Sequence, residues 1–294
     1  LDRAQIPYVV HANYDMEYNW DEDLENQAGE FGMVRHRANI SVPLHKSRSD
    51  FFGLFTANSY YDIDTRAVLP DTGQVFPEEL YDLKAGLAYW HQFENQWDGG
   101  TVFSFGSASD EPFNSYDEME LQATAFLRIP HHENNAWVFL LNYSNNREFL
   151  NHVPLPGVGY WYKPSERYTI LIGIPFAAIN AKPIEDVTLK LFYLPIRTIR
   201  AEAAYQVSEP VEIFAGFRWD NERFYLADRA DDDDRLFYYE KKLSAGTRVQ
   251  FSENVGFELE GGYKFDRFFF EGEDYDDRHL TASILKTAPL SPPI

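Results

Sequence analysis

The sequence predicts an all-β protein, and more closely a closed antiparallel up-and-down transmembrane β-barrel of about 16 strands, with about 14 or 12 as alternatives. Three observations predict it. Apolar residues alternate with polar ones along many segments, short and long connections alternate, and no helix of useful length is signalled. The 19 Tyr and 24 Phe agree, because aromatic residues favour strands. No linker divides the 294 residues, so we expect one domain over residues 1–294.

The clearest alternation lies in residues 243–265, which read LSAGTRVQFSENVGFELEGGYKF. Apolar or small side chains occupy every second position of residues 243–251 and again of residues 255–265. A period of two describes a strand with two chemically different faces, and the short Ser-Glu-Asn link makes the pair an antiparallel hairpin. The same alternation occurs in residues 8–20, 119–129, 199–207 and 211–219.

The connections predict the order in which the strands are joined. Short links with Pro or Asn, such as 163–167 and 251–254, alternate with longer acidic stretches, such as 62–79 and 221–234. Strands joined in this way form a meander. The predicted strands start near Tyr8, Phe31, Phe51, Leu80, Thr101, Met119, Ala136, Gly157, Tyr168, Phe176, Val187, Thr198, Val211, Arg235, Asn254 and Arg278. The pattern is weakest over residues 157–183, where merging short strands would give about 14.

One face of the predicted strands carries charges of both signs. It holds ten acids and ten bases, mixed along neighbouring strands. We expect these residues to line a lumen, where they either form cross-strand pairs that stabilise the wall or set up a transverse field in a water-filled pore. The predicted lumen-lining residues are Asp15, Glu17, Arg35, Arg37, Lys84, Glu120, Arg128, Lys190, Arg200, Glu202, Glu212, Arg218, Lys242, Arg248, Glu258, Glu260 and Lys264, and the same face includes Asp82, Glu240 and Asp266.

The other face is nearly free of charge, and aromatic residues gather at its ends beside the long connections. They are Tyr18, Trp20, Tyr143, Tyr193, Phe217, Trp219, Phe237, Tyr239, Tyr263 and Phe265. This is typical of an aromatic girdle at a membrane interface, so we expect the apolar face to meet lipid in a bacterial outer membrane. A soluble β-rich protein would alternate as well, and it would keep aromatics such as Trp90 and Trp161 for a carbohydrate-like ligand.

The net charge of −21 argues against nucleic-acid binding, which needs a basic surface. Acids concentrate in residues 21–30, 221–234 and 271–277, which would share one arc of the rim of a closed barrel. The simplest interpretation is a solvated surface. A sharper one is Ca²⁺ or Mg²⁺ binding, since these ions prefer carboxylate oxygens, with a bridge to lipopolysaccharide or to a surface partner. The residues for such a site are Asp231, Asp232, Asp233, Asp234, Glu271, Glu273 and Asp274.

Catalytic and cofactor motifs are absent from the sequence. There is no cysteine, no HExxH and no GxSxG, and the Gly-rich pieces 97–106 and 256–263 lie in strand patterns rather than before helices. We therefore expect neither an enzyme nor a bound cofactor, apart from the divalent cation considered above.

Four stretches carry a family resemblance: GVGYWYKPSERY (157–168), YLPIRTIRAEAAYQVSEPVEIFAGFRWDNERF (193–224), DDRLFYYEKKLSAGTR (233–248) and GGYKFDRFFFEGE (261–273). They resemble a porin-like bacterial outer-membrane β-barrel family classed as a domain of unknown function. The resemblance covers roughly residues 150–280, implies location and architecture, and supplies no catalytic residues. Such proteins commonly finish in a strand with a terminal aromatic, whereas this chain ends LTASILKTAPLSPPI.

The function expected from these features is a passive, porin-like diffusion channel for small hydrophilic solutes. The alternative is a structural barrel that anchors or scaffolds a partner at the surface or in the lumen, and the third reading is the soluble carbohydrate-binding protein. The expected partners are membrane lipid and lipopolysaccharide, with a surface or lumenal protein as a further partner and no nucleic acid.

Overall fold

The computed structural model describes residues 9–25, 27–69, 71–147, 149–229, 231–275 and 285–286, and it shows an all-β fold. One short 3₁₀ helix, Tyr116–Glu118, precedes β6. The strands are β1 (His11–Asp23), β2 (Glu30–Lys46), β3 (Asp50–Thr65), β4 (Glu79–Gln92), β5 (Asp98–Ser109), β6 (Met119–His131), β7 (Asn135–Ser144), β8 (Leu155–Ser165), β9 (Tyr168–Ile174), β10 (Ala177–Ile184), β11 (Val187–Leu194), β12 (Thr198–Ser208), β13 (Val211–Phe224), β14 (Arg235–Ser252), β15 (Val255–Gly272) and β16 (Leu285–Lys286).

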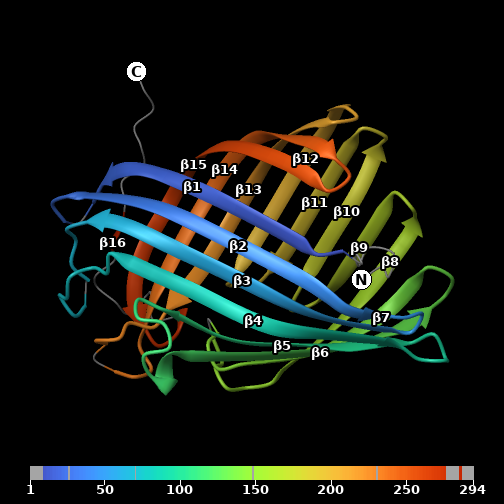
Figure 1. Ribbon diagram of the computed structural model, residues 1–294, viewed down its shortest axis with the longest axis horizontal. Coiled ribbons are helices and arrows are strands. Elements are labelled where there is room, and N and C mark those ends of the chain that lie inside the picture. The colour runs from blue at the N-terminus through green and yellow to red at the C-terminus, as the bar shows by residue number, and fades with distance from the viewer. Residues whose placement is uncertain are drawn as a thin grey trace.

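The strands form one sheet in which spatial order follows chain order from β1 to β16 (Figure 1). Neighbouring strands pair antiparallel throughout, from β1 with β2 to β15 with the two-residue β16. The predicted up-and-down meander is therefore confirmed. Residues 155–184 form three separate short strands, so the alternative in which these merge is wrong.

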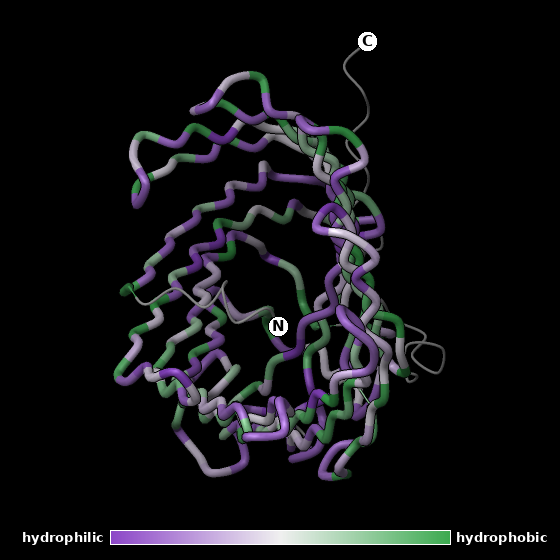
Figure 2. The backbone as a smooth tube through the Cα atoms, turned by 90° about the vertical axis from the view of Figure 1, so that its right-hand side faces the viewer, coloured by the Kyte–Doolittle hydropathy of each residue, from purple (hydrophilic) through white to green (hydrophobic). Residues whose placement is uncertain are grey.

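The sheet curves around an interior but does not close through its backbone in the part of the chain that the structure describes. Its order starts at β1 and ends at β16, and no described pairing joins β16 back to β1. Viewed along the interior, the wall forms an incomplete ring with a gap on one side (Figure 2).

The connections give the sheet two different ends. At the long-loop end lie the described residues of the connections 66–78, 110–118, 145–154 and 225–234, together with the tight links 175–176 and 195–197. At the short-turn end lie brief links such as 166–167 and 253–254. Strand lengths differ as well: β14 and β15 have 18 residues each, whereas β9 has 7. The wall is therefore tall beside the gap and lower over β9 to β11.

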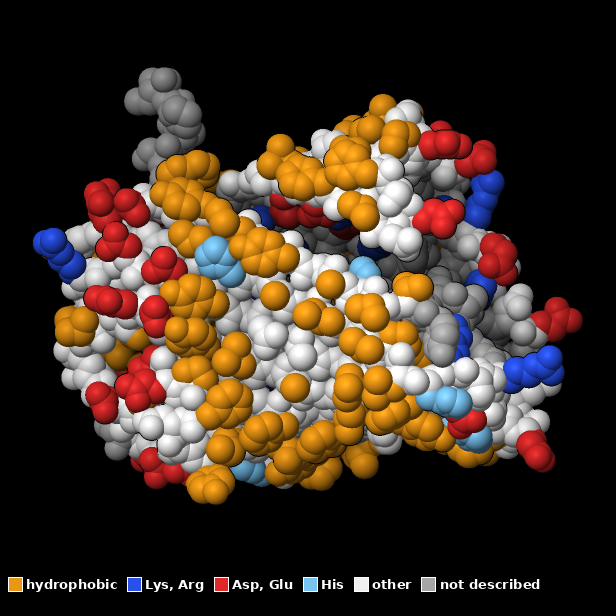
Figure 3. Space-filling view, viewed as in Figure 1, with side chains coloured by type: hydrophobic (Ala, Val, Ile, Leu, Met, Phe, Trp, Pro, Cys, Tyr) orange, Lys and Arg blue, Asp and Glu red, His pale blue; other side chains and the backbone are white. Residues whose placement is uncertain are grey.

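Large hydrophobic side chains cover the outer face of the wall. On β1, Tyr14, Met16, Tyr18 and Trp20 are 53–67% exposed, while Glu17 between them faces the interior and is only 15% exposed. Figure 3 shows this apolar surface in front, with acidic side chains gathered at the long-loop end and charged side chains inside the hollow at the upper right. No helix among the described residues is long and apolar enough to span a membrane.

A buried apolar cluster fills the interior at the long-loop end. Tyr61 on β3 and Phe224 on β13 contact each other there, with ring centroids 5.3 Å apart, although many strands separate them in the sheet. We call this cluster the inner core: Leu24, Phe31, Met33, Tyr61, Ile63, Ala67, Leu69, Phe76, Leu80, Ala108, Phe224, Leu226, Leu236, Tyr238 and Phe269. It joins strands from both sides of the ring and so fills part of the interior at this end.

Candidate functional site

The interior carries a buried ion-pair network beneath the inner core, where the first strands meet the last. The guanidinium of Arg35 on β2 is fully buried and lies 2.5 Å from Glu17 on β1 and 3.4 Å from Glu240 on β14. Lys264 on β15 lies 3.0 Å from Glu17 and 2.5 Å from Glu240. Lys242 lies 3.4 Å from Glu17. These residues place β1 and β2 against β14 and β15 across the gap in the backbone pairing, and we call them the seam network.

Two tyrosine hydroxyl groups donate hydrogen bonds to carboxylates of the network. Tyr61 donates to Glu222 at 2.6 Å, and Tyr238 donates to Glu240. Glu222 also lies 3.7 Å from Arg35. Burying several charges is costly unless each has partners of opposite sign, so this network is held by its mutual contacts, and removing one member leaves another uncompensated.

Three acids of the predicted acidic stretches contact other strands and loops, and two of them, Glu22 and Glu271, are buried. Glu22 is 8% exposed and pairs with Arg267 on β15 at 2.9 Å. Glu222 belongs to the interior contacts just described. Glu271 is 9% exposed and accepts hydrogen bonds from the backbone N–H groups of Asp71 and Thr72 at 3.0 and 3.3 Å. The interpretation of these stretches as a solvated surface is therefore wrong for Glu22 and Glu271, because both are buried against partners on other strands and loops.

A second interior cluster joins β4, β6 and β13. Lys84 lies 2.6 Å from Asp82 and 3.0 Å from Glu120. Asn146, from the connection between β7 and β8, donates to Glu120 and accepts a hydrogen bond from Arg223 Nε at 3.1 Å. A loop residue thus enters the interior and bridges two walls.

A third cluster lies toward the short-turn end. Arg248 contacts three carboxylates: Glu202 at 2.6 Å, Glu212 at 2.9 Å and Glu258 at 2.5 Å. Its guanidinium carbon also lies 4.0 Å from the ring centroid of Phe214. These side chains are 23–42% exposed, so this part of the interior is wetter than the seam network.

All the residues predicted to line the lumen make ion pairs. Beyond the clusters above, the pairs are Arg37 with Asp15 at 2.9 Å, Arg128 with Asp98 at 2.8 Å, Lys190 with Glu202 at 3.2 Å, Lys242 with Glu260 at 2.9 Å, Arg200 with Asp220 at 3.4 Å and Arg218 with Asp220 at 3.7 Å. Most of these pairs join neighbouring strands, the arrangement expected of cross-strand stabilisation.

The structure corrects the predicted position of Asp266, which does not lie on the interior face. It pairs at 2.8 Å with Lys241, which neighbours Lys242 and so belongs to the opposite face of β14, and its side chain is 49% exposed. The pairing of β14 with β15 shifts register here, and Asp266 adopts a positive φ of 48°. The extra residue of this bulge reverses which face the following side chains occupy. The outer aromatics Phe237 and Tyr239 are also buried, packed with Phe268, Phe270 and Tyr275.

Aromatic rings on the interior face were missed by the sequence prediction. Phe55, Phe126 and Phe214 lie against the glycines Gly86, Gly100 and Gly246, where an added Cβ would come within 2.3–2.6 Å of the ring. Glycine is required there because any side chain would displace the ring. The pairing of interior Phe with cross-strand Gly is the sequence signal that could have found them.

The residues predicted for a divalent cation do not form a metal-binding group among the described residues. Asp231, Asp232 and Asp233 are exposed on the loop before β14, whereas Glu271 holds residues 71 and 72. In the described ranges, no group of three or more His, Cys, Asp or Glu side chains is placed to hold a metal ion.

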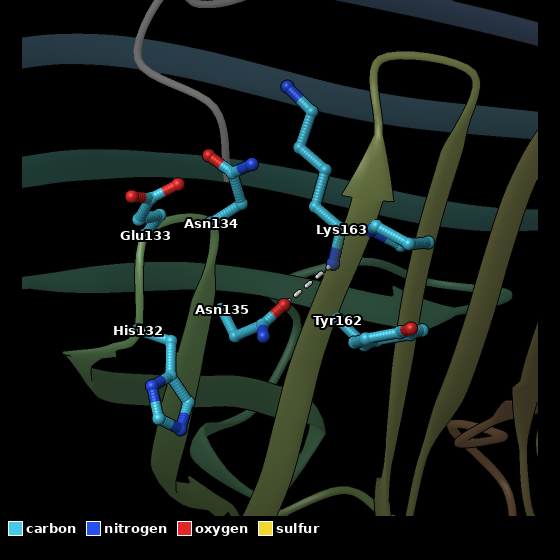
Figure 4. Close-up of a pocket in the computed structure, with 7 residues that line it drawn as sticks. His132, Glu133, Asn134, Asn135, Tyr162 and Lys163 are labelled. Atoms are coloured by element: carbon cyan, nitrogen blue, oxygen red, sulfur yellow. Dashed lines mark hydrogen bonds between the residues drawn. The ribbon is translucent and has the colours of Figure 1, made fainter.

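A shallow pocket lies at the short-turn end, between the turn joining β6 to β7 and the end of β8. Its volume is about 460 Å³, and His132, Asn135, Tyr162 and Lys163 contribute to its lining. The Asn135 side-chain oxygen accepts a hydrogen bond from the backbone N–H of Lys163 at 3.1 Å (Figure 4). Glu133 and Asn134 point away from that contact. The Lys163 ammonium pairs with Glu166 at 2.8 Å, so the charge of this lysine is already neutralised at the rim of the pocket.

Comparisons with known proteins place the chain in a family but name no activity. Neither the curated proteins nor the solved structures gave a match. A family model described as "Domain of unknown function (DUF6268)" matches residues 3–283, nearly the whole chain. The protein therefore belongs to the DUF6268 family.

Proposed function

We propose that the protein is an outer-membrane β-barrel that acts as a gated channel for small hydrophilic solutes, with its long-loop end closed in the conformation described. The observation that carries the membrane location is the polarity of the two faces. Large apolar side chains such as Leu259, 68% exposed, cover the outside, while the interior residues are charged and paired. A water-soluble sheet would bury the apolar face instead.

A row of aromatic rings on the outer face supports a membrane interface. Tyr14, His36, Tyr60 and Tyr81 follow one another across β1 to β4, with ring centroids 6.1, 5.9 and 5.1 Å apart. Their polar atoms are satisfied within the row, since Tyr14 contacts His36 at 2.8 Å and both Tyr60 and Tyr81 donate to Glu79. Rings with one polar edge suit the boundary between lipid and water. Lipopolysaccharide would then surround the long-loop end.

Closure of the barrel is part of the proposal. Lipid does not tolerate an unpaired strand edge, so a wall of this kind must close. Glu22 with Arg267 and Glu17 with Lys264 already hold the two edges together at the long-loop end.

The inner core favours a gated channel over a permanently open one. A passive pore needs a continuous water path, whereas Phe31, Phe224 and Phe269 are at most 1% exposed within the ring. The same observation favours a second candidate function, a structural barrel that scaffolds a partner, because a permanently filled interior needs no transport role.

Conductance of the purified full chain in a planar bilayer tests the proposal, after insertion into vesicles has been verified by protease protection. Discrete steps from a closed baseline would support the gated channel. A steady open current would favour the passive channel, and a folded, inserted but silent barrel would favour the scaffold. Failure to insert would contradict the membrane location itself.

A further inference from the structure

Residues 225–229, which we call the inner strap, leave the wall directly after β13 and reach β5 across the interior. The Tyr225 N–H donates to the Ala108 carbonyl at 2.8 Å. Tyr225 also forms an isolated parallel β-bridge with Ser109. The strands of the wall all pair antiparallel with their neighbours in sequence, so this contact is not part of the meander. The strap therefore spans the ring from one wall to the other.

The strap is attached to the β5 side by few and mainly polar contacts. The Ala227 N–H donates to Asp110 Oδ1 at 2.9 Å. Arg229 lies 3.8 Å from Glu118, and both side chains are buried, at 6% and 2% exposure. The second carboxylate oxygen of Glu118 has no hydrogen-bond partner among the described atoms. This pair is a loose contact between buried charges, which a small displacement would break.

The neighbouring connection 66–78 is held quite differently. It inserts Ala67, Leu69 and Phe76 into the inner core, each 1% exposed. The Phe76 ring packs edge-on against Phe31 and Phe269, at 5.6 and 5.0 Å. The strap contributes Leu226 to the same core, so its apolar anchorage is smaller. The two connections therefore differ in how readily they can leave the interior.

We propose that the inner strap is the moving gate of the barrel and that the Glu118–Arg229 pair is its latch, whereas residues 66–78 remain fixed. This inference rests on the proposed function. Release of the strap from Ser109 and Asp110 breaks the contacts of the strap itself with this side of the ring. The exposed Asp231, Asp232 and Asp233 follow the strap closely, and their mutual repulsion favours its outward position.

A reversible crosslink tests the gate directly, because the chain has no cysteine of its own. Ser109→Cys with Tyr225→Cys places one thiol on β5 and one on the strap, at positions paired in the structure. Oxidation should abolish conductance steps and reduction should restore them. Each single-cysteine variant serves as the control and should not respond to reductant. A double variant that inserts but forms no disulfide, or conducts equally in both states, would overturn the inference.

The latch is tested separately. Glu118→Ala should raise the fraction of time spent open at least about tenfold, since it removes a contact between charged groups that exists only in the closed form. Asp15→Ala is the matched control: it removes an interior ion pair with Arg37 that does not touch the strap, and should leave the open fraction unchanged. Equal effects of the two substitutions in inserted protein would refute the latch while leaving the membrane barrel standing. Failure of the unmodified chain to insert would instead refute the proposed function.

Discussion

The ammonium of Lys264 on β15 lies 3.0 Å from the carboxylate of Glu17 on β1, so the two outermost long strands meet through their side chains. No described backbone pairing joins these strands. Charged side chains thus hold the two strands together at the seam, whereas backbone hydrogen bonds join neighbouring strands elsewhere in the wall.

Arg35 should be the most sensitive member of the seam network. Arg35→Met removes the buried guanidinium that contacts Glu17, Glu222 and Glu240, and it leaves Glu17 and Glu240 with lysine partners alone. We expect this to lower the free energy of unfolding by about 3–5 kcal/mol. Arg37→Met is the control, because Arg37 is 20% exposed and should cost about 1 kcal/mol or less. Urea unfolding of vesicle-inserted protein, followed by tryptophan fluorescence, compares them. An equal loss of unfolding free energy in the two variants would show that the burial of Arg35 does not increase its contribution to stability.

The two faces of β14 should respond oppositely to a new charge. Leu243 is on the outer face and 52% exposed, whereas Ser244 faces the interior opposite Gly262. Leu243→Arg should cost about 2–4 kcal/mol in a bilayer and Ser244→Arg much less. The fraction that folds into vesicles, read from protease protection, measures the difference. If Ser244→Arg is the more damaging substitution, the outer face does not meet lipid.

Glu271 should hold residues 71 and 72 against the end of β15. Glu271→Gln weakens the hydrogen bonds from the Asp71 and Thr72 N–H groups by removing the negative charge of the acceptor, at about 1.5–3 kcal/mol. Hydrogen exchange of these two amides should accelerate, while the Ile63 amide, bonded to the Glu78 carbonyl at 2.8 Å, should not change. Uniform acceleration would mean that the whole fold, and not this contact, has been weakened.

The same contact should depend on pH. Burial and the nearby Glu271 carboxylate raise the pKa of Asp71 above its ordinary value. The folded protein therefore binds this proton more tightly than the unfolded chain does, and stability is lost as pH rises from the ordinary pKa through the raised one. The protection factors of the Asp71 and Thr72 amides should fall across that window. Asp71→Asn should remove this dependence, and its persistence would assign it to another group.

Cation preference should follow the exposed aspartates of the loop before β14. In the Glu118→Ala form, reversal potentials across a salt gradient should show cation selectivity in dilute salt that fades as ionic strength rises, because screening acts beyond about 10 Å at 0.1 M. Neutralising Asp231, Asp232 and Asp233 to Asn should remove most of it, since the lumen charges are paired. Unchanged selectivity would place its origin in the wall.

The strands could be predicted from the sequence because the alternation of apolar and polar residues and the turn residues are local sequence signals. The predicted starts at Met119, Tyr168, Val187, Thr198, Val211 and Arg235 coincide with those of the structure, and the predicted starts at Tyr8 and Arg278 lie outside the described residues. Even the weakly patterned residues 155–184 separate into strands at their short links.

The inner core was not predictable in the same way. Phe76 and Leu226 lie in connections, and their contacts come from strands distant in sequence, so no periodic pattern marks them. The bulge at Asp266 was hidden because apolar residues stand on both sides of it: Phe265 before, and Phe268, Phe269 and Phe270 after. The interior location of Glu22 and Glu271 depends likewise on partners that only the folded chain supplies.

The sequential order of the strands also determines the order in which contacts can form during folding. Every hairpin of the wall forms between neighbours in the chain, which keeps the entropy of closing each loop small. The contact between Glu22 and Arg267 spans 245 positions, so it forms only after the intervening strands are in place. Until then no side-chain contact holds β1 and β15 together, and the unpaired backbone of these edges is a template for other chains. Assembly at high concentration is therefore most vulnerable to aggregation in its last step, and protection of these two edges is what a folding helper must supply.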